Sequence, residues 1–221
     1  AHPFLQRLVL SDGSTIPNNA VVVEMTANTS LQPWLETAVS DFNAGETETA
    51  AGDPIFIVPA YTESGTFVAQ LAGEGSAAPA LWLPDDDVWT AVLADQGDAG
   101  YQGNCTSVAE SPLVIGMWRE AAESLGWPGL PLGWLDIGSL AADPSAWNYY
   151  SGGEFGSALR LSHTHPGLSG AGASTLLALV HAAEAKTESV TPEDIEQPIV
   201  QASVGAFESA VAFFGSDTLE L

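Results

Sequence analysis

Residues 21–42 read VVVEMTANTSLQPWLETAVSDF, and the two periodicities in this stretch decide the predicted fold class. Positions 21–25 form a short β-branched run, which is typical of a strand. After a polar cluster, apolar side chains recur every three or four residues from Leu31 to Phe42, as they do on one face of a helix. Pro33 suits the first helical turn, where its missing N–H costs nothing. The stretch therefore predicts a strand, a loop and a helix.

The same succession recurs along the chain. Further strands are predicted at 54–58, 80–84, 111–117 and 155–161. After a turn at 63–65, further helices are predicted at 66–71, 88–94, 118–125 and 199–214, with others starting within 131–140, after Ser169 and at 191–194. Strands that alternate with helices indicate an α/β fold of mostly parallel sheets flanked by helices. A change of character near residue 111 predicts two lobes, 1–110 and 111–221.

The charge of the chain is strongly negative. Its 221 residues include 28 acidic and only four basic side chains, which give a net charge of −24. Such a chain repels nucleic acid and anionic lipid at long range, so neither is expected as a partner. No run of about 18 apolar residues occurs, so we expect no direct insertion into a membrane.

Cys105 is the only cysteine, which excludes an internal disulfide and a cysteine-based zinc site. We expect it to be buried as a small apolar side chain, the commoner role of an unpaired cysteine. The triplets at 28–30 and 104–106 match the N-glycosylation sequon at Asn28 and Asn104, a pattern short enough to arise often by chance.

Several segments are similar, in order, to those of a known family. They are PWL at 33–35, DFN at 41–43, LWLP at 81–84, SPLVIGMWR at 111–119, AAESLGWP at 121–128, GWLDI at 133–137, HTHP at 163–166, FESAV at 207–211 and FFGS at 213–216. With them the chain resembles extracellular solute-binding proteins of the two-lobed periplasmic type. More narrowly, it resembles the solute-binding-like segment that precedes von Willebrand factor A domains in bacterial surface proteins.

The resemblance implies a fold, a location and a function. The fold would be a type II periplasmic-binding fold, and the protein would lie outside the cell, on its surface or in the periplasm. It would hold a small polar or anionic solute between two lobes without catalysis. A membrane permease or a surface protein is the implied protein partner.

Two departures from the family favour a second hypothesis. The run Ser169-Gly170-Ala171-Gly172 replaces a more polar segment. The family's segment that returns to the first lobe is expected to be absent here or to come from a second chain. Both features favour a non-transport scaffold or adhesion module of a cell-surface assembly that reuses the binding fold.

The candidate ligand-binding residues lie mainly in loops that follow predicted strands. A helix N-terminus presents unpaired N–H groups, serine and threonine add small hydroxyl donors, and glycine allows close approach to the backbone. The residues are Thr29, Ser30, Ser64, Ser111, Ser169 and Gly170. Ordinary helix capping is the alternative role for them. No lysine or arginine lies in these loops, so a neutral or zwitterionic solute is as plausible as an anionic one.

His163 and His165 are the candidates for a metal site. On a strand, residues two positions apart share a face, so both imidazoles could reach one ion. A third ligand would have to come from a residue such as Asp136, Glu154 or His181, and none of these stands at a ligand spacing. We therefore favour a loop-fixing role for the histidines and expect no metal and no cofactor.

Ser169 is the candidate nucleophile, because both histidines lie near it in sequence. Its surroundings, GLSGA at 167–171, are one residue short of the G-x-S-x-G elbow of serine hydrolases. No pair of carboxylates stands out from the general acidity for acid–base chemistry. No enzymatic activity is therefore expected.

Overall fold

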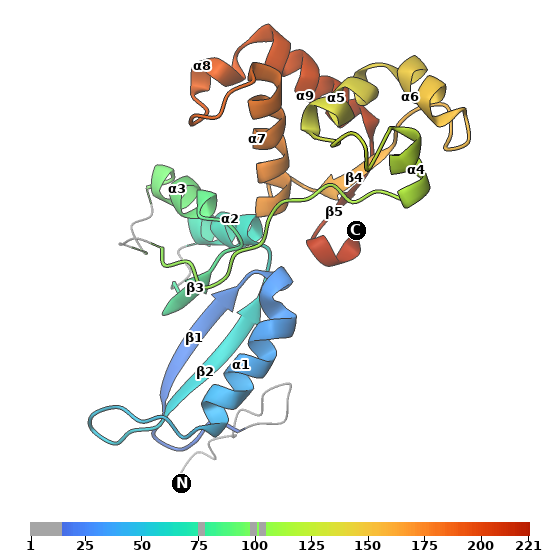
Figure 1. Cartoon of the computed structure of the whole chain (residues 1–221). Helices are drawn as coiled ribbons and strands as arrows, with labels where there is room; N and C mark the ends of the chain where they lie inside the picture. The colour runs from blue at the N-terminus through green and yellow to red at the C-terminus, as the bar shows by residue number, and fades with distance from the viewer. Residues whose placement is uncertain (1–14, 75–77, 98–100, 102–104) are drawn as a thin grey trace. The chain divides into compact units, whose positions relative to one another are not determined.

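The structure is a computed structural model, and it describes residues 15–74, 78–97, 101 and 105–221 (Figure 1). Contacts between residues divide the chain into two compact units, Ala1–Asn104 and Cys105–Leu221. The division falls a few residues before the predicted boundary between 110 and 111. Each unit has its own sheet and its own buried apolar clusters.

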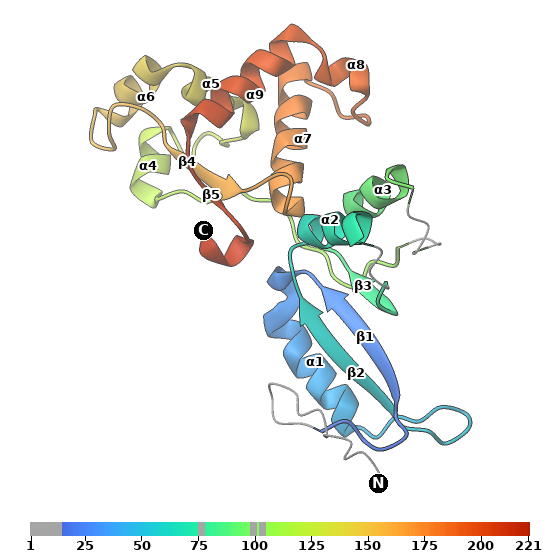
Figure 2. The same cartoon turned by 180° about the vertical axis from the view of Figure 1, so that it is seen from behind.

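The first unit is built on a three-stranded parallel sheet with the order β2-β1-β3 (Figures 1 and 2). Its strands are β1 (Val21–Ala27), β2 (Ile55–Tyr61) and β3 (Leu81–Leu83). In the register, Ala27 is paired with Tyr61 on one side and with Leu83 on the other, so the three strands end together. Ligands collect at such a carboxyl edge in open α/β sheets.

Helices follow each strand of the first unit. They are η1 (Thr29–Leu31), α1 (Gln32–Ala44), α2 (Ser64–Glu74) and α3 (Val88–Asp95). Leu35 and Val39 of α1 pack with Met25 and Ala27 of β1 in one buried cluster. The strand–helix alternation predicted for this unit is confirmed, except that Ser64, expected in a turn, is the first residue of α2.

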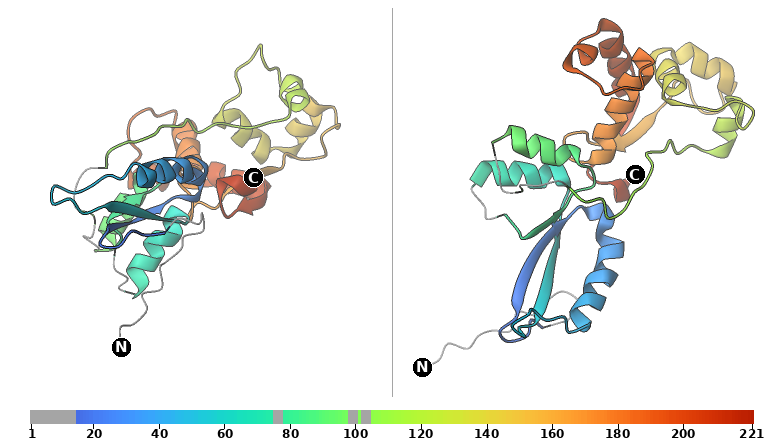
Figure 3. Two further views of the ribbon diagram at one scale, coloured as in Figure 1. Left: turned by 90° about the horizontal axis from the view of Figure 1, so that it is seen from below. Right: turned by 60° about the vertical axis from the view of Figure 1, so that its left-hand side comes forward.

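The second unit contains a two-stranded parallel sheet with helices around it (Figure 3). Its strands are β4 (Leu161–Thr164) and β5 (Val211–Gly215). Its helices are α4 (Arg119–Ser124), α5 (Trp134–Ala142), α6 (Pro144–Ser151), α7 (Gly170–Glu184), α8 (Pro192–Ile195), α9 (Pro198–Ala210) and η2 (Thr218–Glu220). Ile137, Leu179 and Phe207 bring α5, α7 and α9 together in the buried core.

Two elements of the second unit differ from their predicted bounds. The helix predicted to reach Phe214 ends at Ala210, and Val211–Gly215 is β5. Valine and phenylalanine are good strand residues, and pairing with β4 holds this segment extended. The strand predicted at 155–161 is displaced along the chain, since β4 begins only at Leu161.

Three further expectations are corrected by the structure. The segment 111–117, predicted as a strand, is irregular, although Ile115 and Met117 pack on the core at every second position, as in a strand. The helix α6 was not predicted, despite the Pro144 at its first position. Cys105 is exposed, so the prediction that it is buried is wrong; it begins an irregular segment outside every helix and strand.

The described residues thus form a mixed α/β structure of short parallel sheets flanked by helices, as predicted. None of the helices in this part of the chain combines the length and the apolar character needed to cross a bilayer.

Candidate functional site

Five polar residues gather at the carboxyl edge of the first sheet. Asn28 and Thr29 follow β1, Glu63 and Ser64 follow β2, and Asp85 follows β3. Because the three parallel strands end together, the loops that follow them meet at this edge. We call these five residues the edge cluster.

Backbone hydrogen bonds hold the loops of the edge cluster in place. The N–H of Asn28 donates to the carbonyl of Leu83 at 2.9 Å, which ties the end of β1 to β3. The N–H of Thr62 donates to the carbonyl of Ala27 at 3.0 Å, which ties the loop after β2 to β1. The polar side chains are therefore positioned directly by the sheet.

The Ser64 hydroxyl connects all three loops. It is 1% exposed, and it accepts hydrogen bonds from Asn28 Nδ2 and from the N–H of Asp85, both at 3.2 Å. It donates to Asp85 Oδ1 at 2.7 Å. A hydroxyl has one donor and two acceptor positions, and Ser64 uses all of them. Ser64 is therefore the centre of the edge cluster.

Asn28 and Glu63 form the other half of the edge cluster. Nδ2 of Asn28 also donates to Glu63 Oε2 at 3.3 Å, and its Oδ1 accepts the N–H of Ser30 at 2.9 Å. The other carboxylate oxygen of Glu63 accepts a bond from the Thr29 hydroxyl. Asn28 is 1% exposed, so its sequon is inaccessible to glycosylation in the folded chain, and Asn104 lies outside the described residues.

The edge cluster is acidic. Glu63 and Asp85 bring two carboxylates to this edge. Carboxylates accept hydrogen bonds and attract positive charge. The edge is therefore suited to hydroxyl, amide or ammonium groups more than to anions. Asp86, next in sequence, has a separate role, because its Oδ1 accepts the N–H of Val88 at 2.9 Å at the start of α3.

Tyr61 ends β2, two residues before Glu63. Its hydroxyl is buried and has no hydrogen-bond partner within the described part of the chain. Burial, and then the negative charge of Glu36, raise the pKa of Tyr61 above its ordinary value of 10.0. The phenol therefore stays protonated at neutral pH and keeps its hydrogen-bond donor.

Ser169 and Gly170 lie at the N-terminus of α7 in the second unit. The Ser169 side chain is 0% exposed and accepts the N–H of Ala171 at 3.2 Å, so Ser169 caps the helix. Close packing surrounds this helix start: a Cβ added at Gly172 would meet the carbonyl oxygen of Thr164 at 2.3 Å. The glycine at 172 thus has a packing reason, because only a residue without a side chain lets α7 approach the end of β4.

The two histidines have separate surroundings. His163 is buried, its ring contacts those of Phe207 and Phe214, and its Nε2 lies 3.1 Å from Glu208 Oε1. Nδ1 of His165 accepts the N–H of Gly167 at 3.0 Å and so fixes the turn before α7. The described residues contain no group of three or more histidine, cysteine, aspartate or glutamate side chains arranged to hold a metal ion.

The structure brings together some of the predicted site residues, and others belong to the second unit. Thr29 and Ser64 belong to the edge cluster, while Ser30 has an exposed side chain and contributes only its N–H. Ser111 is exposed in an irregular segment of the second unit. Ser169 and Gly170 belong to the same unit, at the start of α7. The prediction missed three members of the edge cluster, which are Asn28, Glu63 and Asp85. It considered only small hydroxyl residues after the strands, whereas a search for every polar residue there finds all three.

The chain was compared with protein-family models, with curated proteins and with solved structures, and none of them matches it.

Proposed function

We propose that the chain is a solute-binding-like protein of two-lobed, type II periplasmic-binding architecture that holds a small polar solute without catalysing a reaction. It would act outside the cell, on the cell surface or in the periplasm. The observation that carries the proposal is the edge cluster. Three loops from three parallel strands place five polar side chains where open α/β sheets bind ligands.

The charges of the edge cluster favour a neutral or ammonium-bearing solute over an anionic one. Glu63 and Asp85 supply two carboxylate acceptors at the carboxyl edge of the sheet. A helix N-terminus contributes only about half a positive charge. The proposed solute is therefore rich in hydroxyl or amine groups, as are sugars, polyols, amino acids and polyamines.

Calorimetric titration of the full chain against sugars, amino acids, polyamines and inorganic oxyanions tests the proposal. Glu63→Gln preserves the shape of the side chain but removes its charge. It should lower the affinity for the solute that binds by about tenfold, or about 1.4 kcal/mol of binding free energy. Glu48→Gln is the matched control, because Glu48 is an exposed carboxylate of the same unit. The control should leave the affinity within about twofold of the original.

Three results would count against this reasoning. If no member of the panel binds, the proposal of solute binding fails. If an oxyanion binds most tightly, the assignment of the solute class is wrong. If Glu63→Gln and Glu48→Gln weaken binding equally, the effect is one of total charge, and the solute does not bind at the edge cluster.

A scaffold or adhesion role is the second proposal, and two observations favour it. Asn28 and Ser64 use their hydrogen-bonding groups on neighbouring residues, which leaves fewer free for a solute. Large aromatic side chains are exposed on the second unit, with Trp118 at 82% and Tyr149 at 80%. Tryptophan and tyrosine are enriched at protein–protein interfaces. In this case Trp118→Ser should reduce retention of the chain by cell envelopes, and Glu63→Gln should not.

A further inference from the structure

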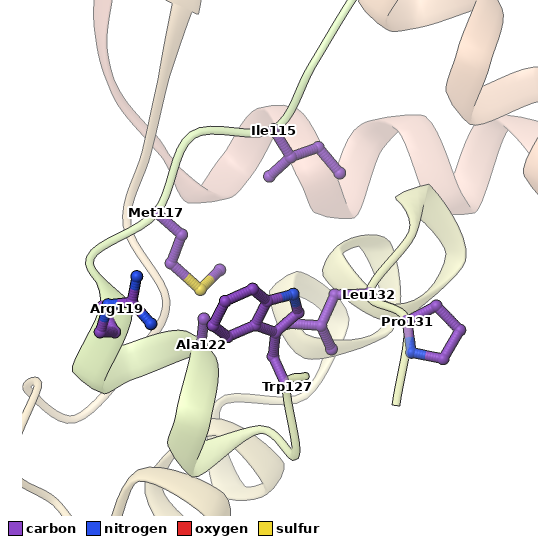
Figure 4. A pocket seen from close by; sticks show the side chains of 7 residues that line it. All are labelled: Ile115, Met117, Arg119, Ala122, Trp127, Pro131 and Leu132. Carbon is purple, nitrogen blue, oxygen red and sulfur yellow. The ribbon is translucent and has the colours of Figure 1, made fainter. Parts of the chain in front are cut away.

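A groove of about 490 Å³ lies in the second unit, and none of its lining residues belongs to the edge cluster. Its lining comes from the segment that leads into α4, from α4 itself and from the turn that follows. The residues are Ile115, Met117, Arg119, Ala122, Trp127, Pro131 and Leu132 (Figure 4). A volume of this size is typical of sites for small organic molecules.

The lining of the groove is apolar except at one position. In Figure 4 the Trp127 indole lies at the centre of the lining, between Met117 and Leu132. Trp127 is 39% exposed, so its ring is partly available for contact. Ile115 and Met117 also pack on the buried core, which holds this wall of the groove in place. The groove therefore offers a firm apolar surface to a ligand.

Arg119 is the one charged residue of the lining. Its guanidinium carbon lies 5.3 Å from the centre of the Trp127 ring, a cation–π contact that limits the positions of the side chain. Glu123 approaches Arg119 at 3.8 Å, but the side chains are 69% and 51% exposed, so this ion pair is weak. The Arg119 guanidinium therefore keeps donors free to face a ligand.

The charge of this lining is opposite to that of the whole chain. The sequence has 28 acidic residues and four basic ones, yet the lining contains one of the basic residues and no acidic residue. A guanidinium binds a carboxylate through two parallel hydrogen bonds. A single cation beside an apolar groove matches one negative charge on an apolar body, and it disfavours amines, which Arg119 would repel.

From this lining and its charge we infer that the groove binds a small monocarboxylate with an apolar body, such as a medium-chain fatty acid or an arylalkanoic acid. The carboxylate faces Arg119, and the apolar body lies against Trp127, Met117 and Leu132. The inference does not depend on solute binding at the edge cluster, because every lining residue belongs to the second unit.

Titration of the full chain with octanoate and octanamide tests the inference, since the two probes share the same apolar chain and differ in charge. Octanoate should bind about tenfold more tightly than octanamide, which corresponds to about 1.4 kcal/mol. Arg119→Gln should abolish this preference and leave octanamide binding within about twofold. Arg160→Gln is the matched control, because Arg160 is an exposed arginine of the same unit outside the groove, and it should preserve the preference.

A second variant keeps the test decisive if Arg119→Gln disturbs the fold. Glu123→Gln removes the acidic neighbour of Arg119, and it should strengthen octanoate binding by about twofold without affecting octanamide. Octanoate that does not bind at millimolar concentration, or that binds no better than octanamide, overturns the inference. Loss of the preference in Arg160→Gln also overturns it, because the effect would then follow net charge. Much tighter binding of a peptide with a free C-terminal leucine would assign the groove to a protein partner instead.

Discussion

Replacement of Gly172 by alanine should destabilise the second unit strongly. Gly172 lies in the first turn of α7, and an added Cβ would stand 2.3 Å from the Thr164 carbonyl oxygen and 2.9 Å from backbone atoms of His165 and Pro166. All three contacts are with backbone, so no side chain can rotate away. The helix would have to move by about 1 Å to restore van der Waals distances, which would disturb the tightly packed interior around it.

The expected cost follows from this geometry. Overpacking of a well-filled interior costs about 1–3 kcal/mol, and the clash with buried backbone places Gly172→Ala near the upper end. Gly205→Ala is the matched control, because Gly205 lies inside α9 with no atom within 4 Å of the added Cβ. Since alanine is a better helix former than glycine, the control substitution should raise the free energy of unfolding by about 0.5–1 kcal/mol.

Urea unfolding of the full chain, followed by circular dichroism, measures both variants. Helix propensity alone predicts that both substitutions stabilise, so opposite signs isolate the effect of the clash. If the free energy of unfolding of Gly172→Ala lies within about 0.5 kcal/mol of that of the original chain, α7 does not approach β4 this closely. The packing explanation for the glycine at 172 would then be wrong.

Three further predictions concern other parts of the chain. Ser64→Ala removes the acceptor of Asn28 Nδ2 and of the Asp85 N–H, so it should lower the free energy of unfolding by about 1–3 kcal/mol. Ser139→Ala, at an exposed hydroxyl, should change that free energy by less than about 0.5 kcal/mol. Equal effects of the two substitutions would contradict the central role of Ser64. Cys105 is exposed, so a thiol reagent should modify the native chain about as fast as the urea-unfolded chain, and strong protection in the native chain would contradict that exposure. The hydrogen bond from Lys186, and then that from the Thr191 N–H, lower the pKa of Asp194 from 3.8 to about 2. This carboxylate therefore stabilises the fold above pH 3.8 and loses that effect as the pH falls to about 2, so acid titration should show a shallower loss of stability in Asp194→Asn than in the original chain.

The first unit follows closely from its sequence because its signals are local. The β-branched run before Met25 and the helical spacing from Leu31 to Phe42 each specify one element without help from distant residues. The meeting of Thr29 and Ser64 was also predictable, since parallel strands bring their carboxyl ends to one edge. The roles of Glu63 and Asp85 were not predictable, because the directions of their side chains depend on the conformations of the neighbouring loops.

The second unit was harder to predict because contacts distant in sequence decide its elements. The segment at 199–214 was predicted as one helix, but its last residues pair with β4 as part of β5. The segment at 111–117 has the alternation of a strand, and Ile115 and Met117 do face the core, yet it lacks the ladder of bonds that would make it one. A local signal was overlooked only at α6, where Asp143 accepts bonds from the N–H groups of Ser145 and Ala146.

The pairing of β4 with β5 has a consequence for the order of folding. The two strands are separated along the chain by α7, α8 and α9, so they meet only after a long loop has closed. The entropy of that closure is lost before the strand contacts repay it, whereas the helices in between form from local contacts within microseconds. During synthesis on a ribosome, His163 and Thr164 of β4 therefore lack their partner strand until residues 211–215 have emerged. We therefore expect the pairing of β4 with β5 to form late in the folding of the second unit.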